Sequence, residues 1–157
     1  MSKRSRTAGR GNNPRRTLLD RAAIKAAKPA AGLYLVATPI GNLSDITLRA
    51  LEVLAGADII ACEDSRVTRK LTERYGITTP VTPYHEHNAA LARPKLLARL
   101  AAGQTVALVS DAGTPLISDP GNKLVRAAQD AGHVVTAIPG ASSVLTAGSP
   151  PGRGAAA

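Results

Sequence analysis

Two short polar segments contain the side chains of this sequence that are best suited to accept a proton. "CEDSR" (62–66) contains Glu63 and Asp64, and "YHEHN" (84–88) contains His85 and His87. Carboxylates and imidazoles are the usual general bases of enzymes, so these four residues are candidate catalytic groups. A structural interpretation competes with this one, because acids also cap and solvate the start of a helix and histidines suit a polar strand exit. Both interpretations stay open at this point.

Three loops combine glycine, proline and small hydroxyl residues, and each follows an apolar run. They are "TPIGN" (38–42), "DAGTPLISDPG" (111–121) and "PGASS" (139–143). Glycine lets a backbone approach a ligand closely, proline fixes a loop before the ligand arrives, and hydroxyl groups form directional hydrogen bonds. Any one of these loops alone is better explained by a tight turn. Together they predict a preformed polar cradle for a small ligand.

Several common kinds of site are excluded by pattern. The first predicted strand is not followed by G-x-G-x-x-G, and G-x-x-x-x-G-K-[ST] is absent, so neither a dinucleotide fingerprint nor a P-loop is expected. A triad of Ser110, His85 and Asp111 would lack the G-x-S-x-G elbow. Cys62 is the single cysteine, and no Cys and His cluster has metal-ligand spacing, so we expect neither an internal disulfide nor a metal site.

The elements that must position these residues follow from the alternation of short apolar runs with amphipathic segments, which predicts an open, mostly parallel α/β sheet of five strands flanked by helices. Asp45 or Thr47 is expected to cap the first helix, and Pro83 to place its strand at an edge. Pro94 is expected near the start of its helix rather than inside it. Ligands bind beyond the carboxyl ends of such strands, where the three loops would meet. The predicted strands are 33–37, 58–62, 81–85, 105–110 and 133–138, and the predicted helices are 47–55, 66–75, 94–102 and 122–131, with another after 143.

The basic character of the chain is concentrated at its start. The 157 residues contain 20 Lys and Arg against 11 Asp and Glu, and residues 1–31 account for nine of those bases with one acid, Asp20. Residues 1–31 are therefore predicted to form a disordered basic tail, which would serve as an RNA tether, a solubilising extension or a transit peptide. No apolar run approaches the roughly 20 residues needed to span a bilayer. No membrane association and a cytoplasmic location are expected.

"LYLVATPIGNLSDITLRALEVLAGADIIACEDSR", "VALVSDAGTPLISDPG" and "IPGASSVLTA" together resemble the N-terminal half of the tetrapyrrole methylase superfamily, in its ribosomal RNA branch. The similarity covers roughly residues 32–147, in the right order and at the right separations. The resemblance implies an S-adenosylmethionine-dependent enzyme that methylates the ribose 2′-hydroxyl of a cytidine in 16S rRNA of the small ribosomal subunit. It also implies a tendency to form a homodimer.

Site residues transfer by motif from the family to this chain. The 111–115 loop is implied to hold the methionine part of the cofactor, and the 139–143 loop to line the same cleft. The 38–42 loop is implied to form the floor near the methyl group or the incoming ribose. Arg66, Arg69 and Lys70 cluster just after the two acids, and two interpretations stay open for them: contact with RNA phosphate, or a solvated helix face, which is the default. The implied cofactor residues are Asp111, Ala112, Gly113, Thr114, Pro115, Pro139, Gly140, Ser142 and Ser143, and the implied substrate-side residues are Thr38, Pro39, Ile40, Gly41, Asn42 and Arg66.

The sequence departs from the family after residue 147. Family members continue into a second domain that forms the other wall of the cofactor cleft, whereas residues 148–157 are low-complexity and suggest a truncated or frameshifted copy. Three functions stay open. They are the RNA methyltransferase, a methylase of porphyrin precursors in the same superfamily, and an inactive fragment that binds RNA through its tail.

Overall fold

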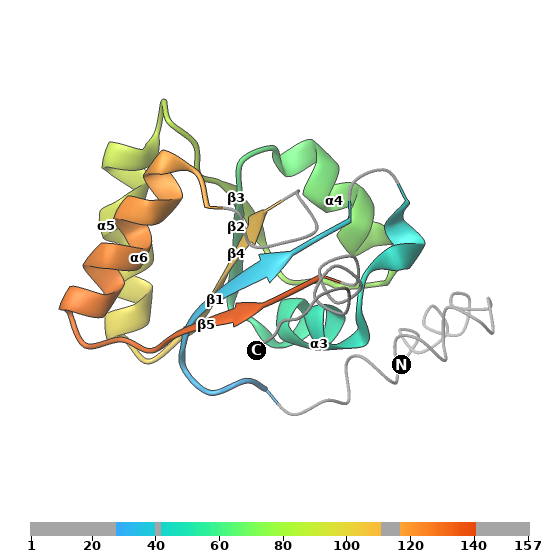
Figure 1. The fold of residues 1–157 in the computed structure, drawn as a ribbon, viewed down its shortest axis with the longest axis horizontal. Helices are drawn as coiled ribbons and strands as arrows, with labels where there is room; N and C mark the ends of the chain where they lie inside the picture. The colour runs from blue at the N-terminus through green and yellow to red at the C-terminus, as the bar shows by residue number, and fades with distance from the viewer. Residues whose placement is uncertain (1–27, 40–41, 111–116, 141–157) are drawn as a thin grey trace, which may run out of the picture.

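A computed structural model of the 157-residue chain describes residues 28–39, 42–110 and 117–140. In this part of the chain, parallel strands alternate with helices, and a short 3-10 helix follows the first strand (Figure 1). The elements are β1 (Gly32–Ala37), η1 (Leu43–Asp45), α3 (Leu48–Gly56), β2 (Ile59–Cys62), α4 (Ser65–Arg74), β3 (Val81–Pro83), α5 (Ala89–Ala101), β4 (Thr105–Ser110), α6 (Asp119–Asp130) and β5 (Val135–Ile138).

All five strands belong to one parallel sheet in the order β3-β2-β4-β1-β5. The open, parallel five-stranded α/β architecture predicted from the sequence is therefore confirmed. Val81–Pro83 lies at one edge, as Pro83 predicted, because proline has no backbone N–H to donate to the hydrogen-bond ladder of a central strand. The two longest strands, β1 and β4, lie side by side, and Gly32 pairs with Thr105 at the start of their register.

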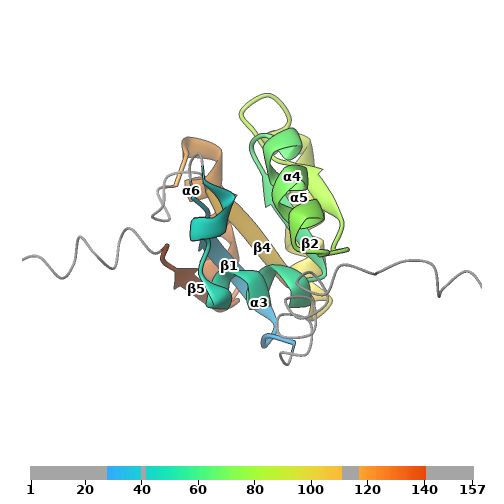
Figure 2. The same cartoon turned by 90° about the vertical axis from the view of Figure 1, so that its right-hand side faces the viewer.

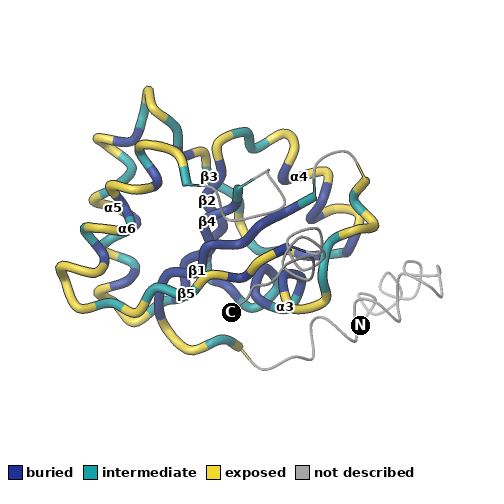
Figure 3. Tube along the Cα trace, viewed as in Figure 1, coloured by how far each residue is buried: buried dark blue, intermediate teal, exposed yellow. Residues whose placement is uncertain are grey.

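Helices cover both faces of the sheet. In Figure 1, α5 and α6 lie together on one side of the strands, and α3 and α4 lie on the other. Leu54 and Leu71 pack with Val36 and Ile60 on the α3 and α4 face. Leu96, Leu100 and Leu124 pack with Leu33 and Val106 on the opposite face. Apolar side chains thus point to both sides of the central strands, whose traces are mostly dark blue in Figure 3.

The crossover connections change face after β3. The connections through α3 and α4 run over one face and lead towards the β3 edge, whereas those through α5 and α6 run over the other face and lead back towards β5 (Figures 1 and 2). The chain that leaves β4 therefore departs to the opposite face from the chains that leave its neighbours β1 and β2. In open parallel sheets this divergence creates a crevice at the carboxyl ends of the strands.

Helix α5 contradicts the prediction that a helix starts near Pro94. The helix begins at Ala89, and Pro94 lies inside it on the exposed side. Its first turn forms around Asn88, whose carbonyl accepts hydrogen bonds from Leu91 and Ala92. The missing proline N–H costs one backbone hydrogen bond, and the burial of Leu96 and Leu100 outweighs that cost.

Helix α6 begins earlier than predicted, at Asp119 instead of Asn122. Ser118 is its N-cap, and its Oγ accepts a hydrogen bond from the N–H of Gly121 at 3.3 Å. Pro120 suits the first turn, where its absent N–H would have had no partner. The last residues of "DAGTPLISDPG" therefore belong to a helix. Strands β3 and β5 are also shorter than the predicted ranges 81–85 and 133–138.

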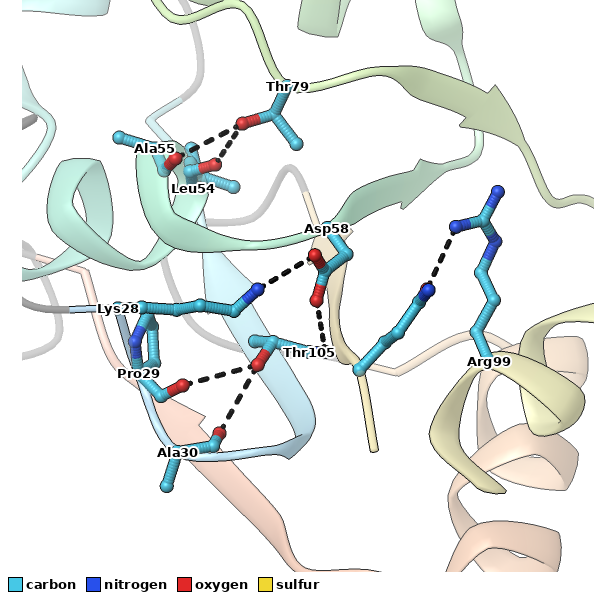
Figure 4. A network of polar contacts seen from close by, with 10 residues as sticks. Lys28, Pro29, Ala30, Leu54, Ala55, Asp58, Thr79, Arg99 and Thr105 are labelled. Atoms are coloured by element: carbon cyan, nitrogen blue, oxygen red, sulfur yellow. Dashed lines mark hydrogen bonds and ion pairs between the residues drawn. The ribbon is translucent and has the colours of Figure 1, made fainter. Parts of the chain in front are cut away.

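The segment before β1 contacts the amino-terminal edge of the sheet (Figure 4). Lys28 forms an ion pair with Asp58 at 2.7 Å, and the Thr105 hydroxyl donates to the carbonyl of Pro29 at 3.2 Å. A side chain at Gly56 would lie 2.5 Å from Pro29 Cδ, so the segment passes close to the end of α3. Residues 1–27 of the predicted tail, the predicted helix after 143 and residues 148–157 lie outside the described residues.

Candidate functional site

The exits of β1 and β4 are joined at the carboxyl edge of the sheet. Thr38 follows β1 and is buried, and both its N–H and its Oγ1 donate to the carbonyl of Ser110, each at 2.9 Å. Pairing of Val36 with Ile138 brings the exit of β5 alongside, so Pro139 and the buried Gly140 follow next to Thr38. The described parts of the three predicted loops therefore lie at one edge, as the sequence indicated.

Nine of the predicted site residues lie outside the described part of the chain, and the structure places the residues that anchor their loops. The 111–116 segment connects Ser110, on β4, to Ile117 and the Ser118 cap of α6. The 40–41 segment connects Pro39 to Asn42. The nine are Ile40, Gly41, Asp111, Ala112, Gly113, Thr114, Pro115, Ser142 and Ser143.

Asn42 has a structural role in the described part of its loop. It caps η1, and its Oδ1 accepts a hydrogen bond from the N–H of Ser44 at 3.0 Å. Two contacts from the carboxyl end of α4 hold the same turn. Tyr75, the C-cap of α4, donates its hydroxyl to the carbonyl of Leu43 at 2.9 Å, and Arg74 donates to Ser44 Oγ at 2.9 Å. These contacts fix where the loop returns to the domain after β1.

The two candidate carboxylates after β2 occupy different environments. Asp64 is the N-cap of α4, and its Oδ1 accepts from the N–H of Arg66 at 3.0 Å. The Arg66 guanidinium, followed by the same backbone hydrogen bond, holds the pKa of this carboxyl below its usual value. A carboxylate with a lowered pKa is a weaker base, so Asp64 is poorly suited to accept a proton. Glu63 is exposed and stands next to the end of β4, because Cys62 pairs with Val109.

The histidines after β3 are arranged by their own backbone. His85 Nδ1 accepts a hydrogen bond from the N–H of His87 at 3.2 Å, which assigns the proton of the neutral ring to Nε2. In that tautomer Nε2 of His85 is a donor, and Nδ1, the acceptor of the ring, is occupied by the N–H of His87. The two rings meet edge to face at 5.8 Å, and the N–H of His85 donates to Asn88 Oδ1 at 2.8 Å.

Strand spacing separates the candidate bases from the β4 exit by different amounts. Tyr84 N–H donates to the Cys62 carbonyl at 2.7 Å, so the exits of β3 and β2 are adjacent. Neighbouring strands lie about 4.8 Å apart, which places Glu63 one strand and His85 two strands, about 10 Å, from β4. Of the four candidate bases, Glu63 is therefore the one that combines an open position with proximity to the β4 exit.

Tyr84 and Arg93 were missed by the sequence analysis, although they link the two halves of this edge. Tyr84 is buried, donates its hydroxyl to the carbonyl of Pro120 at 2.6 Å and accepts from Arg93 Nε at 3.1 Å. One side chain thus connects the exit of β3, the helix α5 and the first turn of α6. No local motif marks such a contact, because its partners are 9 and 36 residues away.

The electrostatics of the carboxyl edge favour anions. The exits of β1, β2, β3 and β4 each lead to the amino-terminal end of the next α-helix, with Thr47, Asp64, Asn88 and Ser118 at the cap positions. Helix N-termini present unpaired N–H groups and the positive end of the helix dipole, which bind carboxylates and phosphates. Within residues 28–39, 42–110 and 117–140, no group of three or more His, Cys, Asp and Glu side chains is placed to hold a metal ion.

The parallel sheet and the divergence of its crossovers define an open α/β domain, the class of fold in which ligands bind beyond the carboxyl ends of the strands. Comparison with known proteins is more specific. A family model described as Tetrapyrrole (Corrin/Porphyrin) Methylases matches residues 32–153. The chain belongs to this family, which confirms the resemblance found in the sequence.

Curated relatives are similar over the same region. A protein of Mesorhizobium japonicum named ribosomal RNA small subunit methyltransferase I is 67% identical over 115 residues, which are 73% of this chain and 39% of the relative. Proteins of the same name from Synechocystis sp. and Bacillus subtilis are 56% and 51% identical, each over 73% of this chain and over 41% and 39% of the relative. The chain thus spans about two fifths of the length of the curated relatives that it matches.

Solved structures support the fold. A cobalt precorrin-4 methyltransferase matches with a TM-score of 0.59 at 23% identity, over 72% of this chain and 47% of that chain. A uroporphyrin-III-C-methyltransferase from Thermus thermophilus matches with a TM-score of 0.54 at 24% identity, over 70% and 48%. These likenesses confirm that the sheet and its helices have the tetrapyrrole methylase arrangement.

Proposed function

We propose that this chain is the amino-terminal, cofactor-binding part of an S-adenosylmethionine-dependent methyltransferase that acts on the ribose 2′-hydroxyl of a cytidine in 16S rRNA. The observation that supports the proposal most directly is the junction of Thr38 with Ser110, which brings the loops after β1 and β4 together where the crossovers diverge. The names of relatives 51–67% identical to this chain support an RNA substrate.

The described residues fit a cofactor with a carboxylate at one end. The exits of β1, β4 and β5 converge, and α6 begins close to them with its N–H groups facing the carboxyl edge. When bound, S-adenosylmethionine supplies a methyl group on a sulfonium. In this proposal residues 111–115 hold the methionine part, Pro139, Gly140, Ser142 and Ser143 line the cleft, and Thr38 to Asn42 form its floor.

The ribose hydroxyl is a poor nucleophile, and the loss of its proton must accompany transfer of the methyl group to oxygen. Glu63 is our candidate to accept that proton, because it is exposed and lies one strand from β4. Asp64 has a positioning role in this proposal, because it caps α4 directly after Glu63 and holds the Arg66 side chain. Alignment of donor and acceptor supplies much of the rate of an in-line displacement.

We also propose the small ribosomal subunit as the substrate particle, a homodimer as the assembly and the cytoplasm as the compartment. The relatives that match this chain contain a further portion beyond the matched region, and the second wall of the cleft belongs there in this proposal. In the part of the chain that the structure describes, no helix is both long and apolar enough to cross a membrane.

The test is a calorimetric titration of the 157-residue protein with S-adenosylmethionine, followed in the same sample by transfer of labelled methyl to small ribosomal subunits. We expect cofactor binding, and a methylated cytidine ribose wherever transfer occurs. Gly113→Val should abolish binding, because a side chain there would block the close approach of the backbone. Ala101→Val is the matched control, since Ala101 is exposed at the far end of α5.

Normal cofactor binding by Gly113→Val would contradict the loop assignment. Transfer of labelled methyl to a porphyrin precursor, and not to RNA, would identify the protein as a methylase of the porphyrin-precursor branch of the superfamily. A folded protein that binds no cofactor would refute methyl transfer by this polypeptide.

A further inference from the structure

Helix α4 has one buried face and one basic face. Thr68, Leu71 and Thr72 are buried against the sheet. Arg66, Arg69, Lys70 and Arg74 recur at helical spacing on the other side and are all exposed, as the yellow segments of α4 in Figure 3 show. Helical rise places Arg66 and Arg74 about 12 Å apart along the axis. We call these four residues the α4 basic stripe.

The charge of the described domain is concentrated in this helix. Helix α4 contains four basic residues and one acid, Glu73, whereas the rest of the described chain contains seven basic and eight acidic residues. The domain outside α4 is therefore slightly acidic. Helix α6, on the opposite face, balances Lys123 and Arg126 with two acids at its ends. A solvated surface helix needs no such excess of one sign, so the stripe fits an anionic partner.

Half of the stripe is engaged by the protein and half is available. Arg66 pairs with Asp64 at 3.4 Å, and Arg74 donates to Ser44 and lies over the Tyr75 ring at 5.8 Å. Arg69 and Lys70 form no ion pair with any described residue. These two side chains are the ones that can contact phosphate without breaking an existing interaction.

The stripe begins at the proposed reaction site. Asp64 caps α4 directly after Glu63, so the basic face runs from the carboxyl edge outwards over the surface. We propose that the α4 basic stripe binds the sugar-phosphate backbone of the RNA next to the methylated nucleotide, with Arg69 and Lys70 as its phosphate contacts. This inference rests on the proposed function and adds the surface through which the RNA is held. Such contacts position a strand without reading its sequence.

The test compares two double variants of the full chain that remove the same charge. Arg69→Gln with Lys70→Gln neutralises the stripe, and Lys123→Gln with Arg126→Gln neutralises two exposed residues of α6. Affinity for purified 16S rRNA is measured by filter binding over a series of salt concentrations. The slope of log K against log salt is negative, and each lost phosphate contact reduces its magnitude by about 0.7 for single strands and 0.9 for duplex.

We expect the magnitude of the slope to fall by about 1.4 to 1.8 in the α4 variant and to stay unchanged in the α6 variant. The basic residues before Lys28 are present in both proteins, so they cannot produce a difference between them. Equal slopes in the two variants, or wild-type protein without measurable affinity for the RNA, would overturn the proposal. Circular dichroism and thermal unfolding confirm that both variants are folded.

Methyl transfer by the same samples separates this inference from the proposed function. If the stripe only holds RNA, the α4 variant raises KM for the RNA and leaves kcat unchanged. A protein that binds no S-adenosylmethionine would refute the methyltransferase while the comparison of slopes still decides the role of the stripe. Normal transfer with an unchanged KM and slope would refute the stripe alone.

Discussion

Asp58 links the segment before β1 to the amino-terminal edge of the sheet, and its removal should destabilise the domain. One carboxylate oxygen accepts from the N–H of Thr105 at 2.8 Å, and the other accepts from Lys28 Nζ at 2.7 Å (Figure 4). Thr105 is fully buried, so its N–H has no access to water once Asp58 is truncated. Asp58→Ala therefore removes one ion pair and leaves one buried donor without a partner.

The two losses have different magnitudes. An unsatisfied buried N–H costs about 1–3 kcal/mol. The pair with Lys28 is worth only about 0.2–1 kcal/mol, because 55% of the lysine side chain and 27% of the Asp58 side chain are exposed. We expect Asp58→Ala to lower the free energy of unfolding by about 2–3 kcal/mol, most of it from Thr105. Asp58→Asn retains an acceptor for Thr105 and should cost less than about 1 kcal/mol, like Lys28→Ala.

Urea unfolding at pH 7 measures these differences, with the m-value as a check that the transition is unchanged in kind. Equal destabilisation by Asp58→Asn and Asp58→Ala would refute the assignment of the main cost to the buried N–H. A loss above 2 kcal/mol in Lys28→Ala would refute it as well, since an exposed pair cannot supply that much.

The pH dependence has a defined sign. The hydrogen bond from Lys28, and then that from Thr105, lower the pKa of Asp58 below its usual value of 3.8. A carboxyl whose pKa is lower in the folded state stabilises the protein above its unfolded pKa. That contribution is lost as the pH falls through the folded-state value. The stability difference between wild type and Asp58→Asn should therefore be constant near pH 7 and shrink below about pH 4.

Three further substitutions test the packing of the helices. Gly121→Ala should destabilise the domain by about 1–2 kcal/mol in urea unfolding, because the new Cβ would lie 2.7 Å from Ile117 Cγ2. Alanine has the better helix propensity, so a stabilised variant would contradict that crowding. Pro94→Ala should raise the melting temperature, because it restores an interior N–H of α5 at an exposed position; an unchanged or lower value would mean that the proline is not a cost. Tyr84→Phe should accelerate hydrogen exchange in the first turn of α6, because Tyr84 donates its hydroxyl to the Pro120 carbonyl there. Tyr75→Phe is the control, since it loses its hydrogen bond to Leu43 on the other face and should leave that exchange unchanged. Equal exchange rates in the two variants would contradict the link.

Much of the fold could be predicted because its signals are local. The apolar runs at 33–37 and 105–110 are strands because their side chains are buried on both faces of a parallel sheet. Thr47 caps α3, one of two residues considered for that role, and Pro83 marks an edge strand. The start of α6 had a readable signal in Ser118, Asp119 and Pro120, a cap followed by residues suited to a first turn.

The remaining features depend on contacts between distant residues. Pairing of β1 with β4 and β5, instead of with β2, is decided by packing of the whole sheet and leaves no local mark. Pro94 is tolerated inside α5 because tertiary burial outweighs propensity. The position of the loop anchors at the carboxyl edge was predictable, because each loop follows a strand of a parallel sheet. The Tyr84 link and the His85 tautomer depend on distances that a sequence does not contain.

The strand order has a consequence for synthesis of the protein. The first strand, β1, finds both of its partners late, because β4 ends at Ser110 and β5 ends at Ile138. Only the β2 and β3 pair can form from neighbouring segments before then. In a nascent chain the apolar strand β1 therefore stays without a partner strand, and helix α3 without a complete sheet to pack on, until most of the domain has been made. Such late pairing favours slow folding and exposes the intermediate to aggregation. Chains released before Ser110 lack the central strand β4, so β1 cannot be joined to the β2 and β3 pair.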